Sequence, residues 1–418
     1  MTDSELIFKM KNDYYMDKPR YDKMKMYYDG SHDINRTYTE QENRCNQKIV
    51  CNYVGKFCEE EIAYTLGNPL SFTSYSGDKS IISDTLYNLF HWKTTHNQEL
   101  MRTVEIYGKA YEVYYTNSDS EFCGKILNPT NAAVYYVDDE IYRFIHFYKK
   151  RFDEGQYYDV YYPDRIDVYR NDILIDSKTN VFHSIPVSVC EIGVEETIFS
   201  KIKTLNDSLN SILSDNANII GDYRNAYMIV SGAELTDETA EKIKHYGIIN
   251  LPTKDAKVEW LIKDLNDTFI VNQINELKLE MYTVTSHIDY QEHLQSNTSG
   301  VVLRSRLISL EQRCKTIFDA ISDTIYDRFK FLFEYIALRY SKNYDWRDIA
   351  IQYSPCVPQD LTSLAQIITQ LDGKISLSTA LSHFPWVENP SLEIEKLKQE
   401  RKEMNEVDLD KLPQVSNG

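Results

Sequence analysis

Three segments in the second half of the chain carry apolar residues at helical spacing. The first runs from Glu196 to Gly221 and predicts a helix with one narrow buried stripe: Ile198, Ile202, Leu205, Leu209, Ile212, Asn216 and Ile219. A second stripe predicts a helix over 268–288: Ile270, Ile274, Leu277, Met281, Val284 and Ile288. A third stripe, from Leu303 to Ile336, predicts a helix over Ser299–Lys342 that would span roughly 65 Å.

The segments between these helices have different patterns. Residues 223–263 read as strand, helix, strand, and Tyr290–Ser299 is a polar loop that leads directly into the long helix. Two moderate helices therefore bracket a small α/β insert, and a loop then precedes one very long helix. A helix of that length is longer than a compact domain buries alone, so this order favours a rod or ring subunit over an enzyme core.

The first half of the chain alternates between helical and strand patterns. Residues 1–30 read as mobile or helical, and helices are predicted over 39–66, which ends at Gly67-Asn68-Pro69, and over 80–107. Strands are predicted over 111–116, 133–137, 142–150, 156–162, 166–169 and 187–191. After the long helix we expect a strand over 349–353 and helices over 360–371, 376–384 and 391–404. The fold class is therefore α+β.

Composition and charge narrow the function further. The 418 residues are 42% hydrophobic and 26% charged, as in an ordinary globular protein. No run of 18 apolar residues and no signal peptide is seen, so we expect a cytosol-like compartment and no membrane. The net charge of −18 is the opposite of what phosphate binding needs. Either nucleic acid is not a partner of this protein, or it passes by without being bound.

Motifs for catalysis or cofactor binding are weak in this sequence. Neither phosphate-binding glycine pattern occurs, so the motor of any ATP-driven process would be a separate protein. The seven cysteines form no Cys-x-x-Cys pair. Around His287 and His293, a polar junction between a helix and a loop explains the cluster of polar residues more simply than a metal site does. One alternative function stays open: Pro163-Asp164, Asp176 and Lys178 match the loose spacing of Mg²⁺-dependent nucleases, although turns already explain their polarity.

Four stretches carry a more specific signal through their order and spacing. They are Asn52–Leu70; Glu99–Val113 with Leu127-Asn128-Pro129; Ser184–Val187 through Leu205–Leu209 to Tyr223–Tyr227; and Ser299-Gly300 with the later Leu371–Ser378. These stretches resemble the portal proteins of tailed double-stranded DNA bacteriophages, in particular those of long-tailed phages of Gram-positive hosts. The resemblance covers about residues 40–400.

The resemblance implies a portal fold with a mixed α/β wing, a two-helix stem, a small α/β clip, a long wing helix and a helical crown. Its expected parts are wing 1–195, stem helices 196–222 and 266–289, clip 223–265, tunnel loop 290–299, long wing helix and closing strand 300–358, crown 359–404 and a disordered tail 405–418. The narrow stripe on each stem helix fits packing against ring neighbours.

The resemblance also implies a function and a set of partners. The chain would form a ring of twelve copies at one capsid vertex of the virion, assembled in the cytoplasm of a bacterial host. Double-stranded DNA would pass through the ring, driven by the terminase large subunit, and later leave through a head-completion adaptor. Major capsid and scaffolding proteins would be further partners. No catalysis, cofactor or metal is expected.

The candidate site residues fall into three groups. The tunnel loop would offer uncharged hydrogen-bonding groups to passing DNA, because it lacks Lys and Arg: Gln291, Gln295, Ser296, Asn297, Thr298 and Ser299. The basic groups expected near the channel are Lys278, Arg304 and Arg306; the alternative is that they pair with Glu276, Glu280 or Glu311 on helix surfaces. In the clip, we expect partner docking around Glu238, Glu241 and Lys242.

Overall fold

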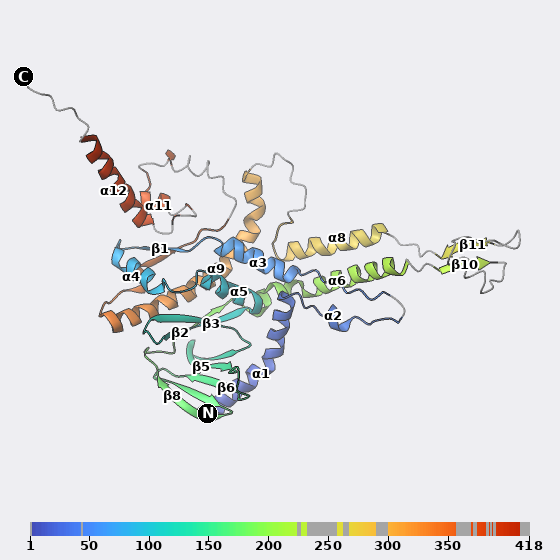
Figure 1. The fold of residues 1–418 in the computed structure, drawn as a ribbon, viewed down its shortest axis with the longest axis horizontal. Helices are drawn as coiled ribbons and strands as arrows, with labels where there is room; N and C mark the ends of the chain where they lie inside the picture. Colours follow the sequence, from blue (N-terminus) through green and yellow to red (C-terminus); the bar gives the residue numbers. More distant parts are fainter. Residues whose placement is uncertain are drawn as a thin grey trace, which may run out of the picture. The chain divides into compact units, whose positions relative to one another are not determined.

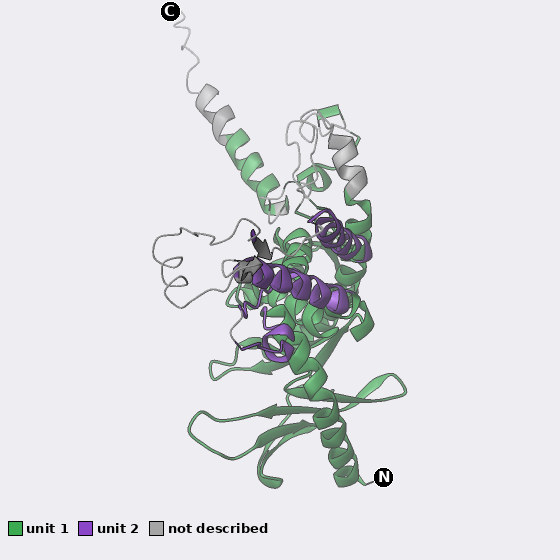
Figure 2. Ribbon diagram, turned by 90° about the vertical axis from the view of Figure 1, so that its right-hand side faces the viewer, with its two compact units in different colours: residues 1–29, 54–201, 285–418 green, residues 30–53, 202–284 purple. Residues whose placement is uncertain are grey.

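The computed structural model (Figure 1) describes residues 2–42, 45–223, 227–231, 257–261, 267–289, 300–356, 369–370, 374–381, 384, 387 and 390–409. The chain divides into two compact units, which Figure 2 colours separately. The first unit contains residues 1–29, 54–201 and 285–418, and the second contains residues 30–53 and 202–284. Helices and antiparallel sheets are both present, so the predicted α+β class is confirmed.

The β-rich part of the first unit is a five-stranded antiparallel sheet. Its order follows the chain: β4 (Ala132–Val137), β5 (Glu140–Tyr148), β6 (Tyr157–Tyr161), β7 (Arg165–Arg170) and β8 (Ile173–Thr179). Two-residue turns join the outer pairs of strands, at Asp138-Asp139 and at Asn171-Asp172. All four residues have positive φ, as the tight turns of β-hairpins require.

Strands β5 and β6 bury side chains on both faces of the sheet, because neighbouring residues of a strand point to opposite sides. Phe144 and Tyr161 face a three-stranded sheet of order β3-β2-β9, made of Phe122–Leu127, Lys109–Thr116 and Val187–Glu191. Ile145 and Val160 face helix α1 (Asp3–Tyr28) on the other side. The aromatic strands of this region therefore build a layered core, as their alternation predicts.

Helix α9 (Gly300–Tyr340) is the central element of the first unit. From Leu307 onward it buries residues every three or four positions: Leu307, Leu310, Cys314, Ile317, Ile321, Ile325, Phe329, Leu332 and Ile336. The greater part of this stripe enters one core with the outer face of the three-stranded sheet and with α3 (Tyr53–Leu66), α4 (Lys79–Leu89) and α5 (His96–Tyr107). Strand β12 (Ile349–Gln352) pairs with β1 (Ser71–Ser74) beside this core. The predicted long helix is thus confirmed.

Gly108 forms the step from α5 to β2. Its φ of 76° lies in the left-handed region, and a Cβ atom at this position would approach the backbone of Gly193 to 2.7 Å. The Gly108 carbonyl accepts hydrogen bonds from the N–H groups of Ile192 and Gly193 at 3.0 and 3.1 Å. Glycine is therefore needed here both for its conformation and for the close approach of the chain that follows β9.

A buried ion pair connects α9 to the three-stranded sheet. Arg328 donates from Nε to Oε2 of Glu112 in β2 at 3.1 Å, and its Nη2 lies 2.9 Å from Oε1 of the same carboxylate. His96 and Tyr114 also hydrogen-bond to this carboxylate. Burial alone would raise the pKa of Glu112, but the charge of Arg328 and the hydrogen bond with His96 lower the pKa to about 2. Glu112 is therefore a fully ionised group inside the core.

Three sequence predictions for the first half of the chain need correction. The helix expected over 39–66 begins only at Tyr53, because residues 38–42 and 45–52 are not helical. The helix expected over 80–107 is two helices, α4 and α5, separated by residues 90–95. Strands β1, β3 and β8 were not expected. Strand β1 has only four residues. Gly124 interrupts β3, where the ring of Trp92 occupies the space of a Cβ, and every residue of β8 is exposed. Neither β3 nor β8 shows the alternation of a half-buried strand.

The second unit contains the helices that bracket the predicted insert. Helix α6 (Ile198–Tyr223), which begins in the first unit, and helix α8 (Asp267–Val284) agree with the predicted ranges within a few residues. Strands β10 (Tyr227–Ser231) and β11 (Lys257–Leu261) pair antiparallel, as expected for the two ends of the insert. The short helix α2 (Ile34–Thr37) precedes α6 in the sequence.

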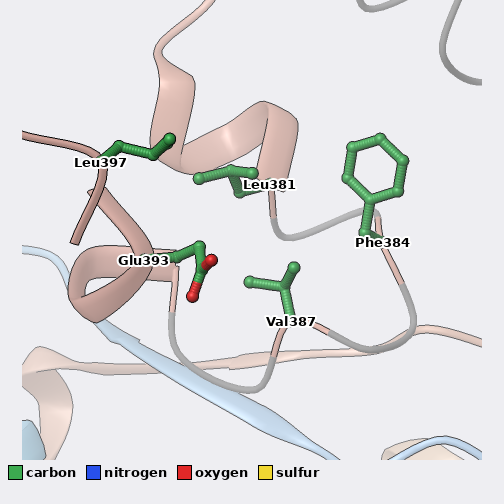
Figure 3. A pocket seen from close by; sticks show the side chains of 5 residues that line it. All are labelled: Leu381, Phe384, Val387, Glu393 and Leu397. Atoms are coloured by element: carbon green, nitrogen blue, oxygen red, sulfur yellow. The ribbon is translucent and has the colours of Figure 1, made fainter. Parts of the chain in front are cut away.

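The C-terminal helices belong to the first unit. Helix α11 (Leu377–Leu381) falls within a predicted helix, and α12 (Pro390–Leu409) extends past the predicted end at 404. A small pocket between them is lined by Leu381, Phe384, Val387, Glu393 and Leu397 (Figure 3). The helix predicted over 360–371 lies largely outside the described residues. Of the helices that the structure describes, none has the length and apolar character that crossing a membrane requires.

The buried pair Glu112–Arg328 gives a test of this architecture. We expect Arg328→Met to destabilise the protein by about 3–5 kcal/mol, because it leaves the Glu112 charge buried without its partner. Adding Glu112→Gln should recover part of this loss. Lys330→Met, which breaks an exposed pair on the same helix, should cost less than about 1 kcal/mol. Urea unfolding at pH 7 measures all three, and equal costs for the two single variants would contradict the assignment.

Candidate functional site

Helix α6 presents a row of four buried polar side chains at intervals of four residues. We call this row the polar ladder; its members are Asn206, Asn210, Ser214 and Asn218. Such residues weaken an isolated helix unless their side chains find hydrogen-bonding partners. Here the partners are backbone groups of the segment 45–53, which belongs to the same unit.

One half of the polar ladder binds the end of this segment that leads into α3. Asn206 accepts a hydrogen bond from the Tyr53 N–H at 3.3 Å and donates one to the Cys51 carbonyl at 2.8 Å. Asn210 accepts from the Cys51 N–H at 2.8 Å. A side-chain amide can serve both backbone groups of one residue because it carries a donor and an acceptor.

The other half binds the earlier residues in the same way. Ser214 accepts from the Ile49 N–H at 2.8 Å. Asn218 accepts from the Gln47 N–H at 2.6 Å and donates to the Gln47 carbonyl at 3.1 Å. Every second residue of the segment is therefore held by the next turn of α6.

The spacing of the two elements explains why the polar ladder works. Four helical residues advance by about 6 Å, and two extended residues advance by about 6.6 Å. Successive ladder residues consequently meet alternate residues of an extended chain. Backbone groups that would otherwise need a neighbouring strand are satisfied by side chains, which is why this segment is extended although its sequence predicts a helix.

The polar ladder changes the interpretation of α6. Ile198, Ile202 and Leu209 of the predicted stripe are buried, but Leu205, Ile212 and Ile219 are only half-buried. The most continuous buried face of α6 beyond residue 205 is thus polar. The four Asn and Ser residues at a spacing of four are visible in the sequence. The prediction missed this polar face because it used only the apolar residues of the helix.

Helix α8 is less buried than its sequence predicts. Met281 is buried, but Ile270, Ile274 and Leu277 are half-buried and Val284 is exposed. Further apolar side chains of this helix are exposed, among them Val271 at 52% and Leu279 at 62% of their surface. Apolar side chains therefore surround much of this helix without being covered by the described residues of the chain.

Lys278 on α8 is half-buried and close enough to Cys51 for its charge to act on the thiol. Burial raises the pKa of Cys51, and the charge of Lys278 opposes this rise. Side chains two positions apart on a helix point in different directions, which disfavours pairing of Lys278 with Glu276 or Glu280. The rest of the pairing alternative, with Glu311 and with Arg304 and Arg306, stays open.

The other predicted site residues cannot be placed. The tunnel-loop residues Gln291, Gln295, Ser296, Asn297, Thr298 and Ser299 lie outside the described residues, and so do the clip residues Glu238, Glu241 and Lys242. Arg304 and Arg306 belong to α9, but the structure does not describe their side chains. These assignments remain predictions.

The structure separates the residues of the nuclease alternative. Asp164 lies in the turn between β6 and β7, is exposed and pairs with Arg165 at 3.3 Å. Its carbonyl accepts from the Asn180 N–H, four residues beyond Asp176 along the extended chain. Four extended residues span about 13 Å, too far for both carboxylates to bind one Mg²⁺ ion. Within the described ranges, no group of three His, Cys, Asp or Glu side chains is arranged to hold a metal.

Comparison with known proteins decides the family. A family model described as phage portal protein, SPP1 Gp6-like, matches residues 7–407, nearly the whole chain. The chain belongs to this phage portal family. A search among curated proteins finds no match.

The portal-family assignment agrees with the fold. A chain in a solved structure, described as the neck of an empty GTA particle computed with C6 symmetry, is similar with a TM-score of 0.50 and 11% sequence identity. The alignment covers 78% of this portal-family chain and 88% of the chain in the neck structure. At this identity the likeness concerns the fold alone, and it supports the expected α+β portal fold.

The polar ladder can be tested by substitution. We expect Asn206→Leu to cost about 1–3 kcal/mol, because it preserves shape but leaves backbone groups of Cys51 and Tyr53 without partners. Amide hydrogen exchange over residues 45–53 should become faster. Ser208→Ala, at an exposed position of α6, should change stability by less than about 0.5 kcal/mol. Unchanged exchange in Asn206→Leu would show that the polar ladder does not hold this segment.

Proposed function

We propose that this portal-family chain forms a ring-shaped channel at one capsid vertex, through which double-stranded DNA is packaged and later ejected. The observation that carries the proposal is the family match over residues 7–407. In this proposal the ring has twelve copies, α6 and α8 are its stem helices, and the strands β10 and β11 belong to the clip. The protein is then a component of the virion, assembled in the cytoplasm of the bacterial host.

The exposed apolar side chains of α8 support assembly with further copies. Val271 and Leu279 project from the helix on which Ile270, Ile274 and Leu277 are only half-buried. Apolar surface of this kind is stabilised when a neighbouring subunit covers it. In a ring, the same helix of every subunit meets a different face of the next one, so one exposed set of side chains can serve all interfaces.

The charge pattern supports passage of DNA rather than binding. The net charge of −18 repels phosphates, and the segment 291–299 contains no Lys or Arg. In this proposal the segment is the tunnel loop, and its amide and hydroxyl groups make short-lived hydrogen bonds to DNA. Lys278, Arg304 and Arg306 would add a sparse set of positive charges near the channel.

The partners follow from the same proposal. The terminase large subunit drives DNA through the ring, and the clip around Glu238, Glu241 and Lys242 docks the terminase and the head-completion adaptor. Major capsid and scaffolding proteins surround the ring at the vertex. The portal subunit itself catalyses no reaction, and the distance between Asp164 and Asp176 gives no support to the nuclease alternative.

Assembly is the first property to test. Leu279→Asp should break the ring, because it places a charge in an apolar interface at a cost of several kcal/mol. Phe152→Asp serves as the control, since Phe152 is an equally apolar residue that is 92% exposed in a loop between strands. Light scattering should give a large oligomer for the unchanged protein and the control, and a smaller species for Leu279→Asp. Identical masses for all three would contradict the proposed interface.

The tunnel loop can be tested by adding charge. Replacing Ser296 and Asn297 with lysine should slow DNA translocation in a packaging assay, because each copy would then attract phosphates. The effect should weaken as the salt concentration rises, and ring assembly should be unchanged. Glutamine at both positions is the matched control for side-chain size. A rate that does not depend on salt in the lysine variant would refute the role of this segment.

A further inference from the structure

Buried polar atoms meet where α3, α5 and α9 pack together in the first unit. We call this cluster the carboxylate junction; its members are Glu61 and Thr65 of α3, Glu105 of α5 and Arg313 of α9. The side chains of Glu61 and Glu105 have no exposed surface, and that of Thr65 has almost none. Carboxylates are almost never buried this completely unless they are paired, so the partners of each one decide what the cluster can do.

Only one of the two carboxylates pairs directly with the arginine. Arg313 donates from Nε to Oε1 of Glu61 at 2.6 Å and from Nη2 to the carbonyl of Glu196 at 3.0 Å. Glu105 differs, because neither of its carboxyl oxygens has a hydrogen-bond partner among the described residues. The same holds, within these residues, for Oε2 of Glu61 and the hydroxyl of Thr65. One cation therefore faces two buried carboxyl groups.

His287 does not supply the missing positive charge. Its Nε2 lies 3.6 Å from Oε1 of Glu61 and 3.3 Å from the carbonyl of Phe57, and its Nδ1 lies 3.0 Å from the carbonyl of Thr285. Burial lowers the pKa of His287, although the negative charges of Glu61 and Glu60 act to raise it. The imidazole is therefore neutral at neutral pH.

The remaining groups around the carboxylate junction do not balance the charge either. Other titratable or charged groups of the described residues near the junction include Cys58, Glu59, Glu60, Lys201, Cys314 and Tyr353. Burial raises the pKa of Tyr353, so its hydroxyl stays neutral. Burial raises the pKa of both thiols, so they stay neutral. Lys201 is a cation, but it pairs with Glu196 at 2.6 Å.

We propose that the carboxylate junction is a proton-binding site, in which Glu105 takes one proton from solvent and stays neutral beside the ion pair of Glu61 and Arg313. A buried carboxyl group without a cation becomes neutral by protonation, because keeping the charge out of water costs far more. The protonated acid also supplies an O–H donor next to Glu61, the group with which it interacts most strongly after burial itself. The junction then has no net charge.

The site makes the stability of the folded protein depend on pH. Burial and the charge of Glu61 raise the pKa of Glu105 well above its usual range. The folded protein thus binds this proton more tightly than the unfolded chain does. Stability from this group is complete below pH 4.5 and is lost as pH rises toward the raised pKa.

Infrared spectroscopy and unfolding of the full-length protein test the proposal. At pH 7 the unchanged protein should show the carbonyl stretch of a protonated carboxylic acid in a non-aqueous environment, and Glu105→Gln should lose this band. Between pH 5 and 7, at fixed protein concentration, the unfolding equilibrium constant of the unchanged protein relative to Glu105→Gln should rise about tenfold per pH unit. Glu99→Gln, an exposed residue of the same helix, should behave like the unchanged protein in both measurements.

Two results would overturn the proposal. The first is the absence of a protonated-acid band at pH 7 in the unchanged protein, a measurement that does not depend on whether any variant folds. The second is the same pH dependence of unfolding in Glu105→Gln and in the unchanged protein. Either result would mean that Glu105 is ionised and that another cation balances the carboxylate junction.

Discussion

The balance of charge along helix α9 is the constraint on which the first unit depends. This helix carries a buried arginine, Arg328, and a half-buried one, Arg313, about 22 Å apart along its axis. Each must meet a carboxylate inside the core, because an unpaired buried charge is strongly destabilising. Arg328 finds Glu112 of β2, and Arg313 finds Glu61 of α3. These two pairs fix which sheet and which helix pack on α9, and the apolar stripe between them fills the space.

A related requirement governs the second unit, where the polar groups belong to the backbone. The segment 45–53 has no sheet partner, and the polar ladder of α6 satisfies its N–H and carbonyl groups at alternate residues. These hydrogen bonds attach the segment 45–53 along one face of α6. That leaves α8, with its exposed Val271 and Leu279, as the element best suited to meet other copies.

Much of the fold follows from hydrophobic periodicity, and the failures have a common cause. The long helix α9, the helices α6 and α8 and six strands were predicted because their apolar residues repeat at 3.6 or 2 positions. Residues 45–52 were assigned to a helix wrongly, because their conformation is set by hydrogen bonds to the polar ladder of α6, which lies more than 150 positions away in the sequence. Strand β8 was missed because an exposed strand has no alternation. Lys278 was predicted from the sequence as a channel residue, and this stays a prediction. The carboxylate junction could not be predicted, because Glu61, Glu105 and Arg313 come together only in the folded chain.

The central claim is the proposal that this portal-family chain builds a closed channel in which residues 290–299 face the passing DNA. Electron cryo-microscopy of the purified, unchanged protein tests it most directly, because one map reports both the assembly and the position of this segment. The account predicts closed rings with α6 and α8 around the axis and with the density for 290–299 facing the channel. Single copies of 49.0 kDa, or rings that carry this segment on their outer surface, would contradict it.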